Sequence, residues 1–271
     1  MTAVGPPGRP PTNRCRVIST PVVRQLAAER RGRYPDPMSQ PLQQIDSNIW
    51  MADGPEVSFF GFGYPTRMVV ARLAEGLWVW SPIELTAELK RAVDGLGRVR
   101  WITTPNRLHH LFVPGWLEVY EEAVALAPPG LAEKRDDIAF AATLGEEPVA
   151  EWTPDIEHVI VHGSVMEEVL FFHRPSSTCI VGDLIQRHEP SSFTGWKAAV
   201  MKLDGMVGDG GSTPREWRAT FLNREGARAA LKAALEWNPR RLVIAHGTCA
   251  MEDGVDVLRN NLDWMTKPWP V

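Results

Sequence analysis

The sequence of 271 residues lacks long apolar runs and contains little cysteine. No run approaches the roughly 20 apolar residues that a membrane-spanning helix requires. The three cysteines, Cys15, Cys179 and Cys249, show no paired spacing. A sparse, odd number of cysteines argues against a disulfide framework and is typical of a reducing compartment. The sequence therefore predicts a cytoplasmic protein with no membrane partner.

The chain also lacks an excess of positive charge. It has 29 Lys and Arg residues against 33 Asp and Glu, a net charge of −4, and therefore no basic footprint for nucleic acid or anionic lipid. Its 44% hydrophobic and 23% charged content is typical of globular proteins, and its length allows a sizeable core. We expect a small-molecule substrate as partner, and the composition gives no oligomeric state.

Residues 1–38 differ in composition from the rest of the chain. This segment is rich in proline and arginine and has no apolar stretch of the kind found in secretory signals. It is predicted to be a disordered arm, with a basic arm that docks on nucleic acid as the alternative. Residues 39–271 are predicted to form a single folded domain.

Hydrophobic patterning predicts an alternation of strands and helices in this domain. Strands are predicted over 49–52, 57–60, 67–73, 77–80, 99–103, 156–161, 168–173, 178–181 and 242–245. Helices are predicted after Ser81 and over 114–126, 214–237 and 255–264. Residues 190–214, rich in glycine and serine, are predicted to be a mobile lid or a surface loop. This order indicates an α/β (α+β) fold, with two sheets between two helical layers.

Potential metal ligands follow three of the predicted strands. Histidine is scarce, with seven residues in the chain, yet His109 and His110 lie together just after the strand at 99–103. Asp183 and His246 each end a short apolar strand. Taken singly, a His or Asp that follows a strand is usually a turn or cap residue. Together they indicate one site on a single rim of a sheet, with ligands that suit zinc, iron or manganese.

Five short phrases carry a resemblance to a known family. They cover residues 77–83, 105–110, 168–176, 182–186 and 244–247. With the strand order, they resemble the metallo-β-lactamase-like superfamily and, within it, an uncharacterised bacterial domain family (a domain of unknown function). The resemblance covers residues 41 to about 266. It implies a four-layer αββα sandwich.

The resemblance also implies that one of the superfamily's two metal positions is lost. The superfamily carries a His-x-His-x-Asp-His loop, which falls on residues 105–110. Pro105 and Arg107 stand at the two histidines of the first metal. The next histidine of that position corresponds to Ser164, with His162 two residues away. The first metal site is therefore expected to be dismantled, and Arg107 is a candidate to bind an anionic group of a substrate there.

The second metal position is expected to remain. In the resemblance His109 stands in place of the aspartate, and His110, Asp183 and His246 match the remaining ligands. These four residues are the predicted ligands of a mononuclear centre, with zinc expected first and iron or manganese as alternatives.

Two further polar residues, Glu168 and His173, lie on the strand before Asp183. Because side chains alternate along a strand, they point to opposite faces and at most one faces the site. Glu168 is the better candidate, as acceptor of a hydrogen bond from a ligand histidine. A salt bridge for Glu168 and a cap of the hairpin end for His173 are the structural alternatives.

Three readings of the function remain open. The first is a metal-dependent hydrolase of esters, lactones, thioesters or phosphodiesters, in which a metal ion activates water. Asp183 would bind the metal and orient the water, and His109, if it is not a ligand, would move the proton. The second is a non-catalytic or regulatory binding protein that keeps the fold without the chemistry. Mononuclear iron redox chemistry is a third reading of the same ligand set.

Overall fold

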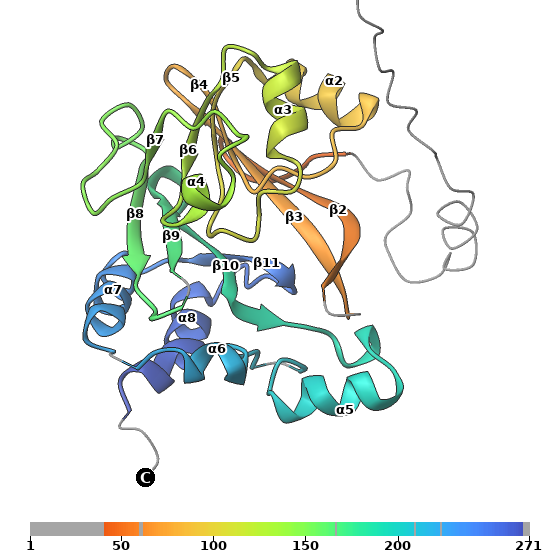
Figure 1. The fold of residues 1–271 in the computed structure, drawn as a ribbon, viewed down its shortest axis with the longest axis vertical. Coiled ribbons are helices and arrows are strands. Elements are labelled where there is room, and N and C mark those ends of the chain that lie inside the picture. Colours follow the sequence, from red (N-terminus) through yellow and green to blue (C-terminus); the bar gives the residue numbers. More distant parts are fainter. Residues whose placement is uncertain (1–40, 60–61, 166, 209, 223, 268–271) are drawn as a thin grey trace, which may run out of the picture. The chain divides into compact units, whose positions relative to one another are not determined.

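The computed structural model describes residues 41–59, 62–165, 167–208, 210–222 and 224–267. The predicted arm, 1–38, lies outside these residues. The described residues all belong to one unit of the chain, Gln40–Val271. They contain two β-sheets and the helices that cover them (Figure 1). None of the helices in these residues is both long and apolar enough to cross a bilayer.

The first sheet has seven strands in the order of the sequence. They are β1 (Gln43–Asp46), β2 (Ile49–Phe59), β3 (Phe62–Leu73), β4 (Gly76–Trp80), β5 (Val99–Thr103), β6 (Val124–Ala127) and β7 (Ala142–Thr143). Strands β1 to β4 pair antiparallel, and β4 to β7 pair parallel. Parallel neighbours need crossover segments, and these contain α2 (Ala87–Leu96), α3 (Val113–Val119) and α4 (Leu131–Lys134).

The second sheet has four strands in the order β11-β10-β9-β8. They are β8 (Ile156–Val161), β9 (Glu168–His173), β10 (Thr178–Arg187) and β11 (Arg241–Gly247). Strands β10 and β11 pair parallel, and the other pairs are antiparallel. Between and after β10 and β11 come α5 (Gly195–Leu203), α6 (Arg215–Ala219), α7 (Glu225–Glu236) and α8 (Gly254–Leu262).

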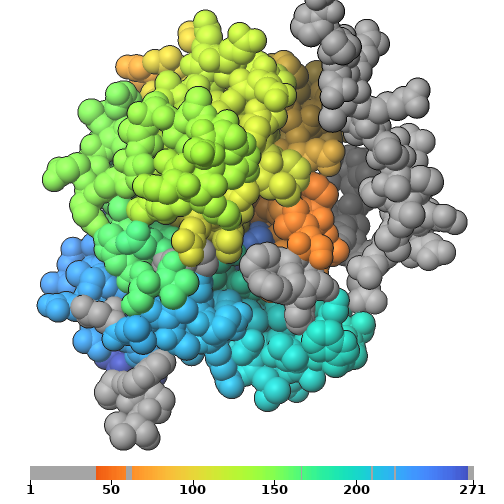
Figure 2. Space-filling view, in the orientation of Figure 1, coloured from red at the N-terminus to blue at the C-terminus, as the bar shows by residue number. Residues whose placement is uncertain are grey.

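Three apolar clusters arrange these elements in four layers. The cluster between the sheets joins Trp78 of the first to Phe171 of the second, with ring centroids 5.2 Å apart. A second cluster packs α2 and α3 on the outer face of the first sheet. A third packs α6, α7 and α8 on the outer face of the second. The predicted fold class is confirmed. In Figure 2 the residues of the first sheet and its helices (orange to yellow-green) lie in the upper part of the view and those of α5–α7 (cyan to blue) in the lower part.

Some predicted element boundaries are wrong. The helix predicted over 114–126 ends at Val119, because Val124–Ala127 pairs with β5 as a strand. The helix predicted over 214–237 is two helices, α6 and α7. Part of the predicted loop at 190–214 is helix α5, which buries only Met201 of its nine residues and so gives no amphipathic signal toward the core.

Candidate metal centre

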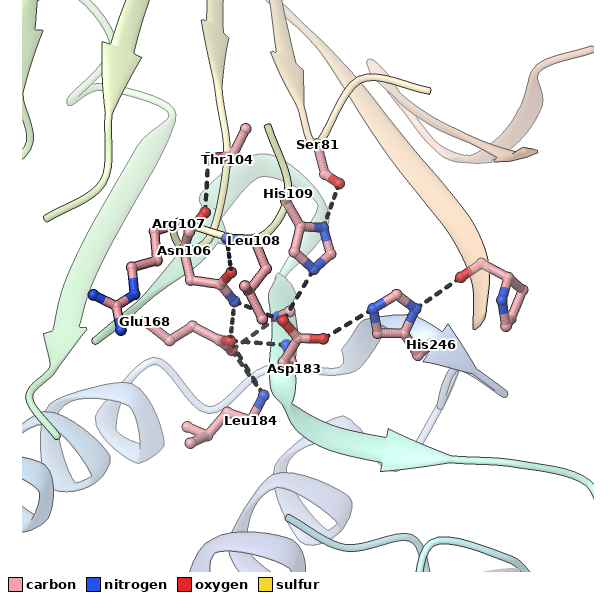
Figure 3. A network of polar contacts seen from close by, with 12 residues as sticks. Ser81, Thr104, Asn106, Arg107, Leu108, His109, Glu168, Asp183, Leu184 and His246 are labelled. Carbon is pink, nitrogen blue, oxygen red and sulfur yellow. Dashed lines mark hydrogen bonds and ion pairs between the residues drawn. The ribbon is translucent and has the colours of Figure 1, made fainter. Parts of the chain in front are cut away.

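Three of the predicted ligands converge from both sheets. His109 lies in the turn between β5 and α3, Asp183 lies in β10, and His246 lies in β11. One ligand atom from each lies within 4.8 Å of the others. The Asp183 carboxylate lies between the rings (Figure 3), with Oδ2 3.2 Å from His109 Nε2 and Oδ1 2.9 Å from His246 Nε2. No other group of three His, Cys, Asp or Glu among the described residues is placed to hold a metal ion.

A bulge in β10 aims Asp183 into this cluster. The strand was expected to end at Asp183 but continues to Arg187. Its register with β11 breaks in between: Val181 pairs with Ile244, and the next pair is Gln186 with His246. The extra residues on β10 leave the ladder unpaired at Asp183, which is the usual effect of a bulge beside a functional site.

The outer nitrogen of each ring is held in place by a neighbouring oxygen. His246 Nδ1 lies 2.7 Å from the carbonyl oxygen of Pro65, and His109 Nδ1 lies 2.8 Å from Ser81 Oγ. Since a carbonyl only accepts, His246 carries a proton on Nδ1, and Nε2 of its neutral ring presents a lone pair to Asp183. Two lone pairs facing each other at 2.9 Å require a proton or a cation between them. The three residues therefore fit a metal ion, whose histidine ligands commonly donate their other N–H to such an oxygen.

The charges in the cluster depend on one another. Burial alone would raise the pKa of Asp183, but His109 and His246 hold that pKa well below its usual range. Burial opposes protonation of His246, yet the hydrogen bond and the charge of Asp183 raise its pKa overall. The cluster thus stabilises an ionised carboxylate with a positive charge beside it, and a metal ion would supply that charge in place of a proton.

Glu168 lies beneath Asp183. The predicted hydrogen bond from a ligand histidine to Glu168 is wrong, because its carboxylate binds backbone groups instead. Its carboxylate accepts the backbone N–H groups of Gly182 and Asp183, at 2.9 and 2.8 Å, and that of Leu184. The side chain is 1% exposed. Burial and the charge of Asp183 raise its pKa to about 8. Glu168 therefore fixes the backbone of the bulge.

Asn106 joins the two carboxylates and was not predicted as a site residue. Its Nδ2 donates to Glu168 Oε2 and to Asp183 Oδ2, each at 2.9 Å, while its Oδ1 accepts the backbone N–H of Leu108. Ser81, bonded to His109, was also missed. It directly follows β4, the strand next to β5, so the rule that located the other ligands at strand ends would have found it.

The structure does not bring His110, the fourth predicted ligand, into the cluster. Consecutive side chains of the turn diverge, so that His109 faces Asp183 while His110 Nδ1 lies 2.5 Å from Nη1 of Arg135. The guanidinium can only donate, so Nδ1 accepts and the ring proton is on Nε2. Burial, Lys134 and Arg135 lower the pKa of His110 to about 4.

The remaining candidates lie apart from the cluster. Arg107 donates from Nη2 to the carbonyl oxygen of Val165 at 2.9 Å. His162 is held between Glu146 and Glu167 near the surface. His173 is buried at the far end of β9, where its Nδ1 lies 2.7 Å from Ser176 Oγ.

A cavity of about 490 Å³ opens over the cluster. Such a volume suits a small organic molecule. His109, Asp183 and His246 line it together with Tyr64 and Trp217. The rest of the lining mixes apolar side chains, among them Pro82, Leu108, Phe112 and Val165, with polar ones, among them Arg107, His110, Lys134, Gln186 and Glu216.

Comparisons with known proteins give the fold. No protein-family profile matches the chain, and no curated protein is significantly similar to it in sequence. Among solved structures, the DIM-1 metallo-β-lactamase exposed to ceftazidime has a TM-score of 0.57 and 13% identity, covering 83% of this chain and 95% of its own. A metallo-β-lactamase from Hirschia baltica has a TM-score of 0.57 and 11% identity over 84% and 98%. The metallo-β-lactamase FIM-1 from Pseudomonas aeruginosa, in its mono-zinc form, has a TM-score of 0.56 and 10% identity, covering 83% of this chain and 94% of its own.

The described chain thus has the metallo-β-lactamase fold. Identities of 10–13% establish architecture alone, because one fold supports many chemistries. On this fold the chain carries a candidate metal centre of two histidines and one aspartate.

Proposed function

We propose that the protein is a metal-dependent hydrolase with one divalent metal ion, held by His109, Asp183 and His246. Zinc is the expected ion, with iron or manganese as alternatives, because imidazole and carboxylate suit all three. The proposal rests on one observation: two ring nitrogens and a carboxylate converge at the base of a cavity, with the His246 lone pair turned inward by Pro65. Three protein ligands are the usual number in catalytic zinc sites.

A metal ion held there would lower the pKa of water and polarise a carbonyl or phosphoryl oxygen. The protein's own side chains would orient the water and bind the substrate. Asp183 orients the attacking water through its carboxylate. His109 would bind the metal ion through Nε2, while Ser81 holds its other nitrogen and keeps the ring oriented. The apolar walls bind the body of the substrate and exclude bulk water.

The proposed substrates are esters, lactones, thioesters or phosphodiesters. The structurally similar proteins support hydrolysis as the reaction class, since they are described as β-lactamases. FIM-1 in its mono-zinc form supports a single metal ion on this fold.

We further propose membership of the bacterial domain family that the five phrases resemble, and a cytoplasmic location. The phrases support the first. The second is supported by the sparse cysteines, of which Cys179 and Cys249 are free thiols.

Metal content tests the proposal directly. The protein would be purified without chelator or affinity metal and compared with Asp183→Ala and His246→Ala by inductively coupled plasma mass spectrometry. His158→Ala is the matched control, since His158 lies on β8 with its Nε2 on Gly145 O, away from the cluster. Circular dichroism would verify that each variant is folded.

We expect about one metal ion per chain in the wild type and in the control, and its loss in both cluster variants. Ion-dependent turnover on a panel of the four substrate classes should follow the same pattern. A wild type that takes up no metal even after reconstitution would overturn the proposal in favour of a binding protein. Metal that remains in both variants would show that the ligand set is wrong.

A further inference from the structure

We propose that the cavity holds its substrate by an anionic group, bound by the side chains of Arg107, Lys134 and His110. This inference rests on the proposed function for the reaction that follows binding, but the anion site itself does not require it. The site lies in the same cavity as the candidate metal centre, since all three residues line it. The anion site would therefore determine which substrates the protein binds, and the candidate metal centre which bond it cleaves.

The first argument is that two cations face the cavity without carboxylate partners. Arg107 donates from Nη2 to the carbonyl oxygen of Val165, and Lys134 Nζ donates to the carbonyl oxygen of Arg107, at 2.9 Å in each case. In the part of the chain that the structure describes, neither forms an ion pair. Their neighbour Arg135, in contrast, is satisfied by two bonds to Asp137, of 2.6 and 2.7 Å.

The second argument is the tautomer of His110. The Arg135 guanidinium donates to Nδ1 at 2.5 Å, which leaves the proton of the neutral ring on Nε2. No acceptor for this N–H is found among the described residues. His110 lines the cavity, so its fixed donor is available to a ligand. Arg107, Lys134 and His110 thus present only donors.

The local charge supports this reading. Burial and the charges of Arg107 and Arg135 lower the pKa of Lys134. Two cations side by side repel each other, and an anion between them removes that cost. An arginine fork and a lysine match the oxygens of a carboxylate or a phosphate.

The remaining walls define the rest of the ligand. Leu111 and Val165, each 58% exposed, lie with Leu108 and Phe112 around the donors. Surfaces of this kind bind apolar groups. The inferred substrate is therefore an ester, thioester, lactone or phosphodiester with an apolar body and a carboxylate or phosphate group.

The first test measures anion binding without metal. Inorganic phosphate and acetate would be titrated separately by isothermal calorimetry into the His246→Ala variant, so that neither probe binds a metal ion. Arg107→Ala, Lys134→Gln and Arg107→Lys would be added to this background. Lys232→Gln is the matched control, because Lys232 is an exposed cation on α7, which does not line the cavity.

We expect Arg107→Ala and Lys134→Gln each to weaken binding about tenfold or more, as loss of a charge-assisted hydrogen bond predicts. Arg107→Lys should restore part of the binding, and Lys232→Gln should leave it unchanged. The tighter of phosphate and acetate identifies the natural group. The proposal would be overturned if the affinities for phosphate and for acetate were the same in the Arg107→Ala and Lys134→Gln variants as in the His246→Ala background.

The second test separates the anion site from the hydrolase. Matched esters that end in a phosphate, a carboxylate or a neutral amide would be assayed with metal-loaded wild type and Lys134→Gln. We expect kcat/KM for the anionic esters to fall about tenfold in the variant and that for the neutral ester to stay constant. An equal fall for all three would overturn the anion site. Anion binding with no hydrolysis of any ester would support the site and refute the proposed function.

Discussion

Gly182→Ala is expected to damage both the fold and the candidate metal centre. Gly182 precedes Asp183 in the bulge of β10. A Cβ atom at this position would lie 2.7 Å from Cβ and Cγ of Pro105 and 2.9 Å from Glu168 Oε2. Carbon atoms pack at about 3.5–4.0 Å, so the neighbours would have to retreat by about 0.8 Å.

Neither neighbour can retreat at low cost. The backbone oxygen of Pro105 accepts the N–H of Val169 at 2.8 Å, and its side chain is a rigid ring. Glu168 is held by backbone N–H groups and by Asn106. Overpacking costs about 1–3 kcal/mol, and one broken buried hydrogen bond adds about 1–3 kcal/mol. We expect a loss of about 3 kcal/mol, which lowers the Tm by roughly 6–12 °C for a domain of this size.

Denaturant unfolding and zinc titration would measure the two effects. The control is Gly95→Ala, at an exposed position of α2 where an added Cβ meets no heavy atom within 4 Å. It should be neutral or stabilising by up to about 1 kcal/mol. We expect Gly182→Ala to bind zinc at least about tenfold more weakly. Wild-type stability and zinc affinity in this variant would refute the claim that packing against Pro105 and Glu168 positions Asp183.

Two further predictions concern buried polar groups. Asn106→Ala removes the donor shared by Glu168 and Asp183, and should weaken zinc binding about 10- to 100-fold; unchanged affinity by calorimetry would contradict this role. His173 is fully buried, and burial lowers its pKa from 6.5 to about 4. The unfolded state therefore binds more protons between these values, and the unfolding free energy should fall by about 3 kcal/mol as the pH drops from 6.5 to 4. Denaturant unfolding at several pH values should show a shallower fall in His173→Gln, and an identical fall would contradict the assignment.

The sequence was sufficient for most of the fold because each sheet buries regular apolar runs. The strands around Trp78 and Phe171 were predicted, and both side chains lie between the sheets. Helix α5 was missed because Trp196 and Leu203 are each 67% exposed, so its apolar residues do not face the core. Where burial does not shape the pattern, periodicity carries no information.

For the candidate site, the position of residues at strand ends predicted which residues belong to it but not where their side chains point. His109 and His110 are adjacent in sequence, yet only His109 faces Asp183. The direction of each side chain follows from turn geometry and from Arg135, a residue 25 positions away from His110. Asn106 was not predicted as a site residue, because its contacts to Glu168 and Asp183 span 62 and 77 residues. Contacts at such separations leave no local pattern in the sequence.

One short turn supplies both halves of the proposed binding site. Arg107 and His110 belong to the proposed anion site in the lining of the cavity. His109, between them in sequence, contacts Asp183. Because these residues share one backbone segment, the distance between the anion site and the candidate metal centre is set by the turn and not by a mobile lid. The turn is itself tied to the bulge through Asn106. A substrate must therefore match one fixed spacing between its anionic group and the bond to be cleaved, and kcat/KM should peak at a single spacer length in a series of otherwise identical esters.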